Sequence, residues 1–197
     1  MDTRSSYITN DFGTLLKNYV IIWKPVGLVE LGVLDGYSTI AIAEGLRDID
    51  RLYGVVTKIR AFDLFDDYAY KHGNMEEVQA KIDSAGLSKY VELAQGDAYK
   101  VWEQFEDEKV EMLHVDISNT GDTLRDIMQL WHPKLRERCI VCFEGGSQER
   151  DEIPWMKDFN KPPIKKELET NQLINDRYIY GVYMRYPSMT VMLKKWY

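Results

Sequence analysis

The sequence contains few of the residues that mark disulfide-bonded, metal-rich or membrane-spanning proteins. Only two cysteines and three histidines occur in 197 residues, and Cys139 and Cys142 share one apolar run. Their C-x-x-C spacing occurs in redox and zinc sites, but residues three apart in a strand point to opposite faces. We therefore interpret the pair as two buried thiols in a reducing compartment.

Long apolar runs and a targeting signal are also missing. No run approaches the ~20 apolar residues that cross a bilayer. The first residues, MDTRSSYITN, lack the basic region and apolar core of a secretory signal. These absences predict a soluble, cytoplasmic protein without a membrane partner.

Basic residues are outnumbered, with 25 Lys and Arg against 32 Asp and Glu, which gives a net charge of −7. This balance disfavours a broad surface for nucleic acid and favours small or uncharged substrates. A chain of this length with 45% hydrophobic residues suits one domain, residues 1–197. Whether two copies associate into a homo-oligomer is left open.

The dinucleotide fingerprint G-x-G-x-x-G is absent, yet one glycine-bearing stretch organises the chain. Residues 27–46 read GLVELGVLDGYSTIAIAEGL. Residues 28–31 are typical of a buried parallel strand, Gly32 and Gly36 permit a tight turn, and Ser38 opens a helical pattern. In an open α/β sheet, this order predicts a ligand site at the carboxyl end of the strand.

Glu30, directly before the turn, helps to distinguish the ligands. Its carboxylate would repel a pyrophosphate, whereas it suits the ammonium and sulfonium groups of S-adenosylmethionine. The residues Glu30-Leu31-Gly32 and Gly36-Tyr37-Ser38 resemble the first motif of class I methyltransferases, especially the catechol and macrocin O-methyltransferases. The resemblance implies that this motif binds S-adenosylmethionine through Glu30, Gly32, Gly36, Tyr37 and Ser38. The alternative is a strand-turn-helix corner that binds nothing.

The flanking elements follow from apolar spacing and capping residues. Residues 8–24 predict an amphipathic helix capped by Asn10 or Asp11, within an N-terminal helical segment, 1–25. A polar break over residues 48–51 is expected after the central helix. Residues 59–63 predict the second strand, and residues 52–56 belong either to it or to an insertion. A helix from Asn74 to Gly86 follows.

Asp63 ends the second strand, roughly 20 to 30 residues beyond the glycine turn, where a ribose diol would need an acceptor. The run Phe62 to Asp67 also resembles the FDSF segment of macrocin-type sugar O-methyltransferases. We therefore predict that Asp63 binds the ribose. The alternative is that it belongs to an acidic surface loop.

The third strand, residues 90–94, leads into Gly96-Asp97-Ala98. In this fold that turn faces the adenine, so Asp97 would accept from the exocyclic amine and Ala98 would supply a backbone N–H. Asp97 also suits the cap of a helix over residues 99–105, and the two roles are compatible.

Two acids end the next pair of strands. Residues 110–115 lead to Asp116, and residues 139–143 lead to Glu144, with a helix over 120–131 between them. Adjacent strand ends should bring the carboxylates together near the transferred methyl group. With Asn119 or Ser118 as an oxygen donor they would suit Mg²⁺, which lowers the pKa of a substrate hydroxyl. The alternative is that Asp116 only orients substrate and Glu144 only bonds backbone.

The resemblance implies the same metal ligands but also shows two departures. Related sequences carry D-G-x-H after the fourth strand, where this chain has Asp116-Ile117-Ser118-Asn119, so the expected histidine base is absent. The usual adjacent acid or amide pair after the fifth strand is reduced to Glu144-Gly145. His114 is a further catalytic candidate, against a buried core role, whereas His72 and His132 are expected in solvent.

The C-terminal part predicts a lid and a hairpin. Residues 145–175 are charged and contain three prolines, and they form a predicted lid or substrate wall, lined by Arg150 and Asp151 and anchored by Trp155, Met156 and Phe159. Residues 164–175 suit one polar helix. Residues 178–185 and 189–195 alternate as an antiparallel hairpin.

The complete prediction is an α/β fold, a Rossmann-like doubly wound, mostly parallel seven-stranded sheet with a C-terminal antiparallel hairpin. The resemblance implies transfer of a methyl group from S-adenosylmethionine to a hydroxyl of a sugar or other small molecule, with assistance by Mg²⁺ left open. Asp116, Glu144 and His114 are the catalytic candidates, and Asp116 also borders the cofactor. The alternatives are a catalytically silent accessory domain and, less favoured, an NAD-dependent oxidoreductase.

Overall fold

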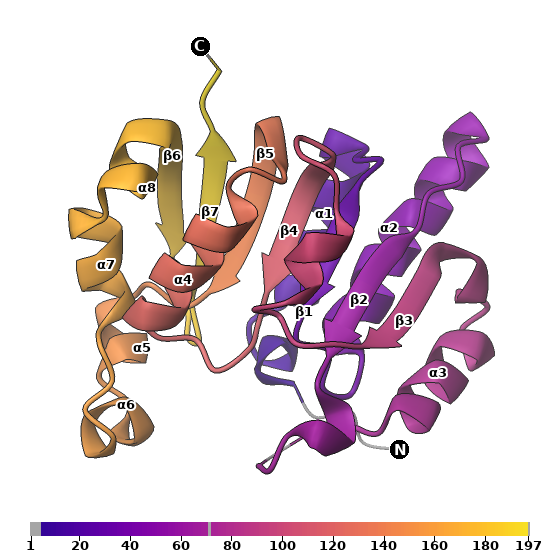
Figure 1. Cartoon of the computed structure of the whole chain (residues 1–197). Helices are drawn as coiled ribbons and strands as arrows, with labels where there is room; N and C mark the ends of the chain where they lie inside the picture. The colour runs from indigo at the N-terminus through magenta and orange to yellow at the C-terminus, as the bar shows by residue number, and fades with distance from the viewer. Residues whose placement is uncertain (1–4, 71, 197) are drawn as a thin grey trace. The chain divides into compact units, whose positions relative to one another are not determined.

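The computed structural model describes residues 5–70 and 72–196. Its contacts divide the chain into two compact units, residues 1–98 and 99–197, coloured from indigo to magenta and from magenta to yellow in Figure 1. The strand order is β3-β2-β1 in the first unit and β4-β5-β7-β6 in the second, within a seven-stranded sheet. The predicted fold class is confirmed, while the single domain expected over residues 1–197 stays a prediction.

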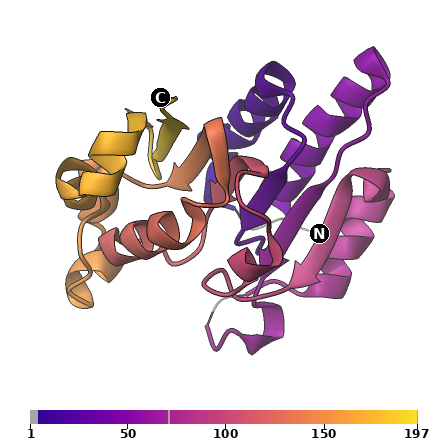
Figure 2. The ribbon, with the colours of Figure 1, turned by 45° about the horizontal axis from the view of Figure 1, so that its top comes forward.

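The first unit alternates strands and helices. β1 pairs with β2 and β2 with β3, both in parallel, and α1 and α2 run side by side (Figure 2). Gly45 permits this contact, because a Cβ there would lie 3.0 Å from the backbone oxygen of Lys17. The elements are η1 (Ser6–Ile8), α1 (Phe12–Trp23), β1 (Leu28–Leu31), α2 (Tyr37–Tyr53), β2 (Ile59–Asp63), η2 (Phe65–Asp67), α3 (Met75–Ser84), η3 (Ser88–Tyr90) and β3 (Val91–Gln95).

The predicted polar break over residues 48–51 is wrong, because α2 continues through it to Tyr53. Ile49 lies on the buried face of α2, and the Asp50 carboxylate accepts hydrogen bonds from two side chains of the turn before β3. Charged residues on the outer face of a helix do not interrupt it. The helix ends at Gly54, whose φ of 67° is the left-handed conformation common after helices.

The second unit contains the hairpin. β4 and β5 are parallel, whereas β7 is antiparallel to both β5 and β6, as predicted. In Figure 1, α7 lies beside α4 and α8 beside β6. The elements are η4 (Val101–Gln104), β4 (Val110–Val115), α4 (Gly121–Trp131), β5 (Leu135–Glu144), α5 (Gln148–Asp151), α6 (Pro154–Asp158), α7 (Ile164–Thr170), α8 (Gln172–Arg177), β6 (Tyr178–Tyr183) and β7 (Met189–Lys194).

Several predicted boundaries need correction. Residues 52–56, left open between a strand and an insertion, divide between the end of α2 and a loop. The helix expected over 99–105 is only the short 3-10 helix η4. The helix expected over 164–175 breaks at Asn171, whose side chain accepts a bond from the Ile174 N–H and so caps α8. β5 begins at Leu135, earlier than the apolar run suggested.

The core confirms that both cysteines are buried, while the reducing compartment stays a prediction. Cys139 and Cys142 are free and buried in β5, and burial raises the pKa of each thiol to about 12. α4 turns its predicted apolar face inward, with Leu124, Ile127, Met128 and Trp131 all buried.

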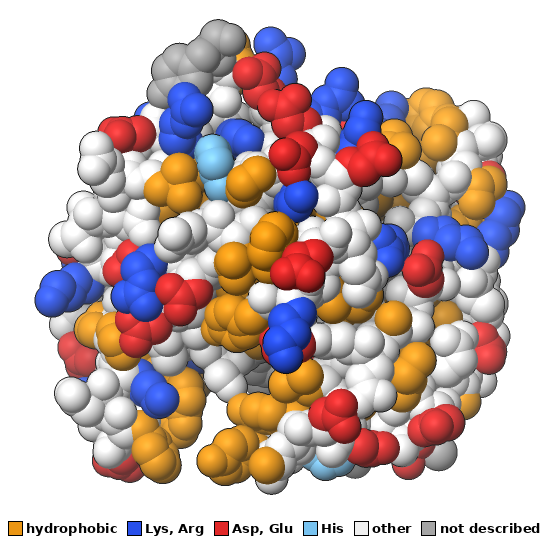
Figure 3. Space-filling view, viewed as in Figure 1, with side chains coloured by type: hydrophobic (Ala, Val, Ile, Leu, Met, Phe, Trp, Pro, Cys, Tyr) orange, Lys and Arg blue, Asp and Glu red, His pale blue; other side chains and the backbone are white. Residues whose placement is uncertain are grey.

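The helices and the surface charges show two further features of the described residues. Among the described residues, no helix combines the length and apolar character that a membrane crossing needs. On the face shown in Figure 3, acidic and basic side chains are interspersed.

Candidate functional site

The glycine loop, residues 32–36, has the backbone that its sequence predicts. Gly32 and Gly36 adopt φ values of 94° and 83°, and Leu34 between them has a φ of 50°. The Gly36 N–H donates to the Val33 oxygen at 2.9 Å and closes the turn. A Cβ at Gly36 would also lie only 3.0 Å from Val78. Both conformation and space therefore favour glycine there.

Asp63 binds this loop directly. Its Oδ2 accepts hydrogen bonds from the backbone N–H groups of Val33 and Leu34 at 2.6 and 2.9 Å, and its Oδ1 accepts from Phe65 at 3.0 Å. Successive N–H groups around a left-handed residue form a concave anion-binding site, and the carboxylate fills it. Asp63 is half-buried, and carboxylate oxygens have more than one acceptor position, so the ribose role stays a prediction.

Glu30 lies beneath the loop. Its side chain is 0% exposed, and its Oε2 accepts a 2.5 Å hydrogen bond from the Thr39 hydroxyl in the first turn of α2. This contact joins β1 to α2 and so fixes the entry into the helix. Glu30 thus presents no surface to the methionine end of a cofactor, and the position favours an indirect role.

Tyr37 and Ser38, the other two residues of the motif, lie at the start of α2. Tyr37 packs against α1, where its ring lies 2.8 Å from the position of a Cβ on Gly13. Ser38 is buried at the start of α2. The binding roles of both residues stay predictions.

The turn after β3 lies beside Asp63. β2 and β3 are parallel with Asp63 opposite Gln95, and the Gly96 N–H donates to the Asp63 backbone oxygen at 2.8 Å. Asp97 is half-buried and Ala98 is buried. The first unit therefore brings the glycine loop, Asp63 and residues 96–98 to the carboxyl ends of β1, β2 and β3, as predicted.

In the second unit, Asp116 and Glu144 also end neighbouring strands, because β4 and β5 are parallel with Val115 opposite Phe143. Glu144 is only 4% exposed. Arg150, in α5, donates from Nε to Glu144 Oε1 at 2.7 Å and from Nη2 to Oε2 at 3.2 Å. This two-point contact is the strong form of an arginine-carboxylate pair.

The surroundings of Glu144 act on its charge in opposite directions. Burial raises the pKa of the Glu144 carboxyl, and the negative charge of Asp116 raises it further, whereas Arg150 and Asn119 lower it. Asn119 faces Glu144 with its amide nitrogen, which donates to the backbone oxygen at 2.9 Å and to Oε2 at 3.4 Å. Its amide oxygen accepts from the Ile117 N–H.

The predicted Mg²⁺ ligands Asp116, Glu144 and Asn119 do not fit a metal ion in this arrangement. Glu144 is paired with a guanidinium, and Asn119 turns N–H groups toward it rather than an oxygen. Over residues 5–70 and 72–196, no three His, Cys, Asp or Glu side chains cluster as a metal site would require. The prediction of metal ligands is therefore not supported.

The ion pair of Arg150 with Glu144 is a contact that sequence reasoning missed. The sequence assigned Arg150, with Asp151, to the lining of a lid, yet it is 7% exposed and buried against Glu144. Glu144 itself could have indicated a basic partner, because a buried carboxylate at the end of an apolar strand needs a countercharge.

The predicted lid is bound into the second unit. Asp151 accepts backbone bonds from the first residues of α7 at 2.9 and 2.8 Å. Of the expected anchors, Met156 is buried, Trp155 is half-buried, and Phe159 is 66% exposed, so its anchoring role was wrong. A lid function stays a prediction.

The histidines lie elsewhere. His114 is fully buried within β4, which favours the core role. His72 is partly exposed, as expected for a loop. His132 is not solvated as predicted: it is half-buried, and its Nδ1 lies 2.7 Å from the Tyr178 hydroxyl. Burial, followed by the charges of Lys194 and Arg177, lowers the His132 pKa to about 4.

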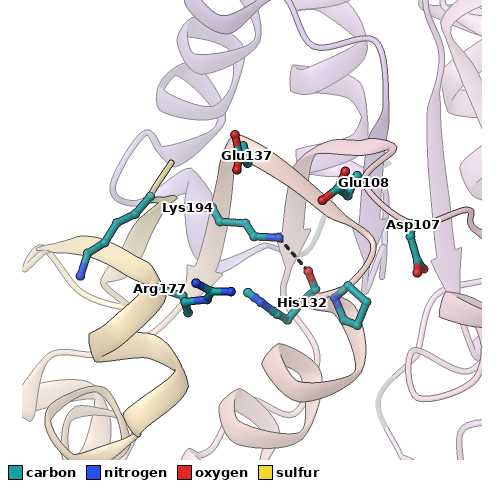
Figure 4. A pocket seen from close by; sticks show the side chains of 8 residues that line it. Asp107, Glu108, His132, Glu137, Arg177 and Lys194 are labelled. Atoms are coloured by element: carbon teal, nitrogen blue, oxygen red, sulfur yellow. Dashed lines mark hydrogen bonds between the residues drawn. The ribbon is translucent and has the colours of Figure 1, made fainter. Parts of the chain in front are cut away.

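His132 borders a cavity of about 460 Å³, lined by Asp107, Glu108, His132, Pro133, Glu137, Arg177, Lys194 and Lys195. Figure 4 shows Lys194 reaching the backbone oxygen of His132, a 3.0 Å hydrogen bond. The cavity lies by the residues that precede β5, whereas Glu144 ends that strand. Ligands of open α/β sheets bind at the carboxyl ends of strands, so we do not assign the site here.

The comparison with known protein families matches the part of the chain that contains the glycine loop and the strand-end acids. The model of a family described as a methyltransferase domain matches residues 29–144. No curated protein sequence matches the chain significantly. Several solved structures share the fold at low sequence identity.

The SAH-bound methyltransferase PaMTH1 from Podospora anserina is 19% identical, with a TM-score of 0.70 over 98% of this chain and 81% of that one. The O-methyltransferase from Bacillus cereus in complex with SAH is 17% identical, with a TM-score of 0.70 over 98% and 84%. The O-methyltransferase TomG from Streptomyces achromogenes, in complex with SAM, is 17% identical, with a TM-score of 0.67 over 99% and 83%.

Proposed function

Since the chain belongs to the family of methyltransferase domains, we propose that it transfers a methyl group from S-adenosylmethionine to a hydroxyl oxygen of a small molecule. The observation that supports this best is the convergence of the glycine loop, Asp63 and residues 96–98 at one edge of the first unit. The similar folds of TomG, in complex with SAM, and of the Bacillus cereus O-methyltransferase, in complex with SAH, support the same cofactor and reaction.

The loop favours this cofactor over NAD. The Val33 and Leu34 N–H groups, which a pyrophosphate would need, are bonded to the Asp63 carboxylate. A diphosphate would have to displace the Asp63 carboxylate from these N–H groups, and the two negative charges repel each other. The neutral ribose instead needs acceptors, which Asp63 supplies, and residues 96–98 supply acceptor and donor groups for adenine.

The transfer itself breaks the bond between methyl carbon and sulfur and forms one between that carbon and the acceptor oxygen. The sulfonium charge is lost, so the protein mainly aligns the groups and removes the hydroxyl proton. We assign that proton to Asp116, because Glu144 already pairs with Arg150 and His114 is buried. A sugar hydroxyl is one acceptor of the proposed class.

A catalytically silent cofactor-binding or accessory domain is the second candidate. The engagement of Glu144 by Arg150 favours it, because the ion pair occupies one of the two acids that were expected to act on the acceptor. Turnover separates the two candidates.

The test is a calorimetric titration with S-adenosylhomocysteine of the wild type, of Asp63→Ala, and of Asp67→Ala as a control that removes a neighbouring exposed acid. We expect micromolar binding by the wild type and the control, and a dissociation constant raised ~10-fold or more in Asp63→Ala. No binding by a folded wild type would refute the proposal. Binding without methyl transfer to any of a panel of sugar and phenol hydroxyls would favour the silent domain.

A further inference from the structure

We propose that the guanidinium of Arg150 takes the place of a divalent metal ion in this chain, balancing the charges of Glu144 and Asp116 so that methyl transfer proceeds without a metal. This inference rests on the proposed function, and it concerns the second unit only. It assigns Arg150 as a positioning residue for the acceptor side of the reaction.

A guanidinium already lies where a metal ion would be needed to balance negative charge. A metal at these strand ends would bring positive charge to two carboxylates, and Arg150 already brings it to one of them at 2.7 and 3.2 Å. Asp116 and Glu144 both act on the charge of Arg150, so all three groups form one electrostatic cluster. A cation added beside an intact guanidinium would meet like charge.

The backbone after β5 leaves no space for a second acid or amide side chain. A second acid or amide after β5 would stand at position 145, where glycine has a φ of 108° and its Cβ would collide with Ile164 of α7. Gly146 has a φ of 110°, and a Cβ there would meet the Thr190 hydroxyl. The backbone that brings Arg150 back onto Glu144 therefore excludes the extra side chain that a metal site would use.

Arg150 also has one donor group that no described residue uses. Its Nε and Nη2 are bonded, whereas its buried Nη1 has no hydrogen-bond partner among the described residues. A buried donor without an acceptor is unfavourable. Nη1 is enclosed in this arrangement, so an oxygen of the acceptor molecule would reach it only when the surrounding side chains move to admit the acceptor.

The test is a titration with Mn²⁺, followed by the loss of its free electron paramagnetic resonance signal. It compares the wild type, Arg150→Met, Arg150→Lys and Arg125→Met. Arg125 also pairs with two acids, Asp122 and Asp126, but on the exposed side of α4. We expect Mn²⁺ binding at least ~10-fold tighter in Arg150→Met than in the other three proteins, because only that change removes the guanidinium from the buried Glu144 beside Asp116.

Two results would overturn the inference: tight stoichiometric Mn²⁺ binding by the wild type, or a folded Arg150→Met that binds no more Mn²⁺ than Arg125→Met. If Arg150→Met does not fold, the wild type and Arg150→Lys decide, and neither should bind Mn²⁺ more tightly than the control.

A parallel titration of the wild type with S-adenosylhomocysteine tests the proposed function independently. Cofactor binding together with Mn²⁺ binding would refute the inference alone. Absence of cofactor binding would refute the proposed function whatever the Mn²⁺ result.

Discussion

Asp63 should stabilise the fold as well as bind the cofactor, and the structure allows the two effects to be separated. Its carboxylate accepts three backbone hydrogen bonds, from Val33, Leu34 and Phe65. Hydrogen bonds to charged groups contribute about 1.5–3 kcal/mol each, but the three share one side chain and the site is partly open to water. We expect Asp63→Ala to lower the free energy of unfolding by about 3 kcal/mol.

Backbone strain adds to this dependence. Leu34 and Phe65 are held at φ values of 50° and 47°, where a residue with a side chain is disfavoured by about 1 kcal/mol. Asp63 supports both through its hydrogen bonds. Leu34→Gly should therefore restore roughly 1 kcal/mol in the Asp63→Ala background.

Urea denaturation followed by circular dichroism measures these differences, and Asp67→Ala provides the matched control. Asp63→Asn should lie between the wild type and Asp63→Ala, because it keeps an acceptor oxygen but loses the charge. An unfolding free energy of Asp63→Ala within about 0.5 kcal/mol of the control would refute the role of Asp63 in holding the glycine loop.

Two further predictions concern the second unit. Gly145→Ala should destabilise the chain by about 2–3 kcal/mol, because position 145 has a positive φ and a Cβ there would collide with Ile164. Gly54→Ala is the control, since position 54 also has a positive φ but lies in open space, and it should cost only about 1 kcal/mol. Chemical denaturation of both variants measures the difference. The free energy of unfolding of the wild type should fall as pH falls from 6.5 to 4, because the unfolded chain protonates His132 before the folded chain does. His132 should contribute about 1–2 kcal/mol to this decrease, after allowing for its partial exposure. A pH series in which the unfolding free energy of His132→Phe has the same slope would contradict the prediction.

The elements that the sequence predicted well are those with local signals. α3 begins after Asn74, whose side chain accepts a bond from the Glu77 N–H, and α4 begins after Thr120, which caps it in the same way through the Thr123 N–H. Their apolar spacings identify the buried face before any fold is known. The positions of Asp116 and Glu144 at neighbouring strand ends followed equally directly from parallel pairing.

The errors occurred where distant or backbone contacts decide the structure. The charged residues after the middle of α2 read as a break, yet Asp50 is held by Lys89, 39 positions away in the chain. The contact of Arg150 with Glu144 requires a turn at two glycines whose φ values the sequence does not state. Backbone N–H groups bind Asp63, and almost every residue type carries such a group. A sequence pattern therefore does not show which of them will bind a side chain.

Asp63 and Glu144, two of the strand-end acids predicted to bind ligands, share one property that changes how the site should be tested. Asp63 is bonded by the backbone of its own loop, and Glu144 by Arg150. In both cases the protein supplies donors to a carboxylate that a ligand was expected to use. The same charge that would recognise a ribose or an acceptor therefore also holds the local backbone in place.

A loss of binding in a variant of Asp63 or Glu144 consequently has two possible causes, a lost contact or a displaced loop. The unfolding free energy separates them, since a lost ligand contact leaves it unchanged while a displaced loop lowers it. If Asp63→Asn binds S-adenosylhomocysteine weakly but unfolds like the wild type, the carboxylate contacts the cofactor directly. If stability and affinity fall together and Leu34→Gly restores both, Asp63 acts through the shape of the glycine loop.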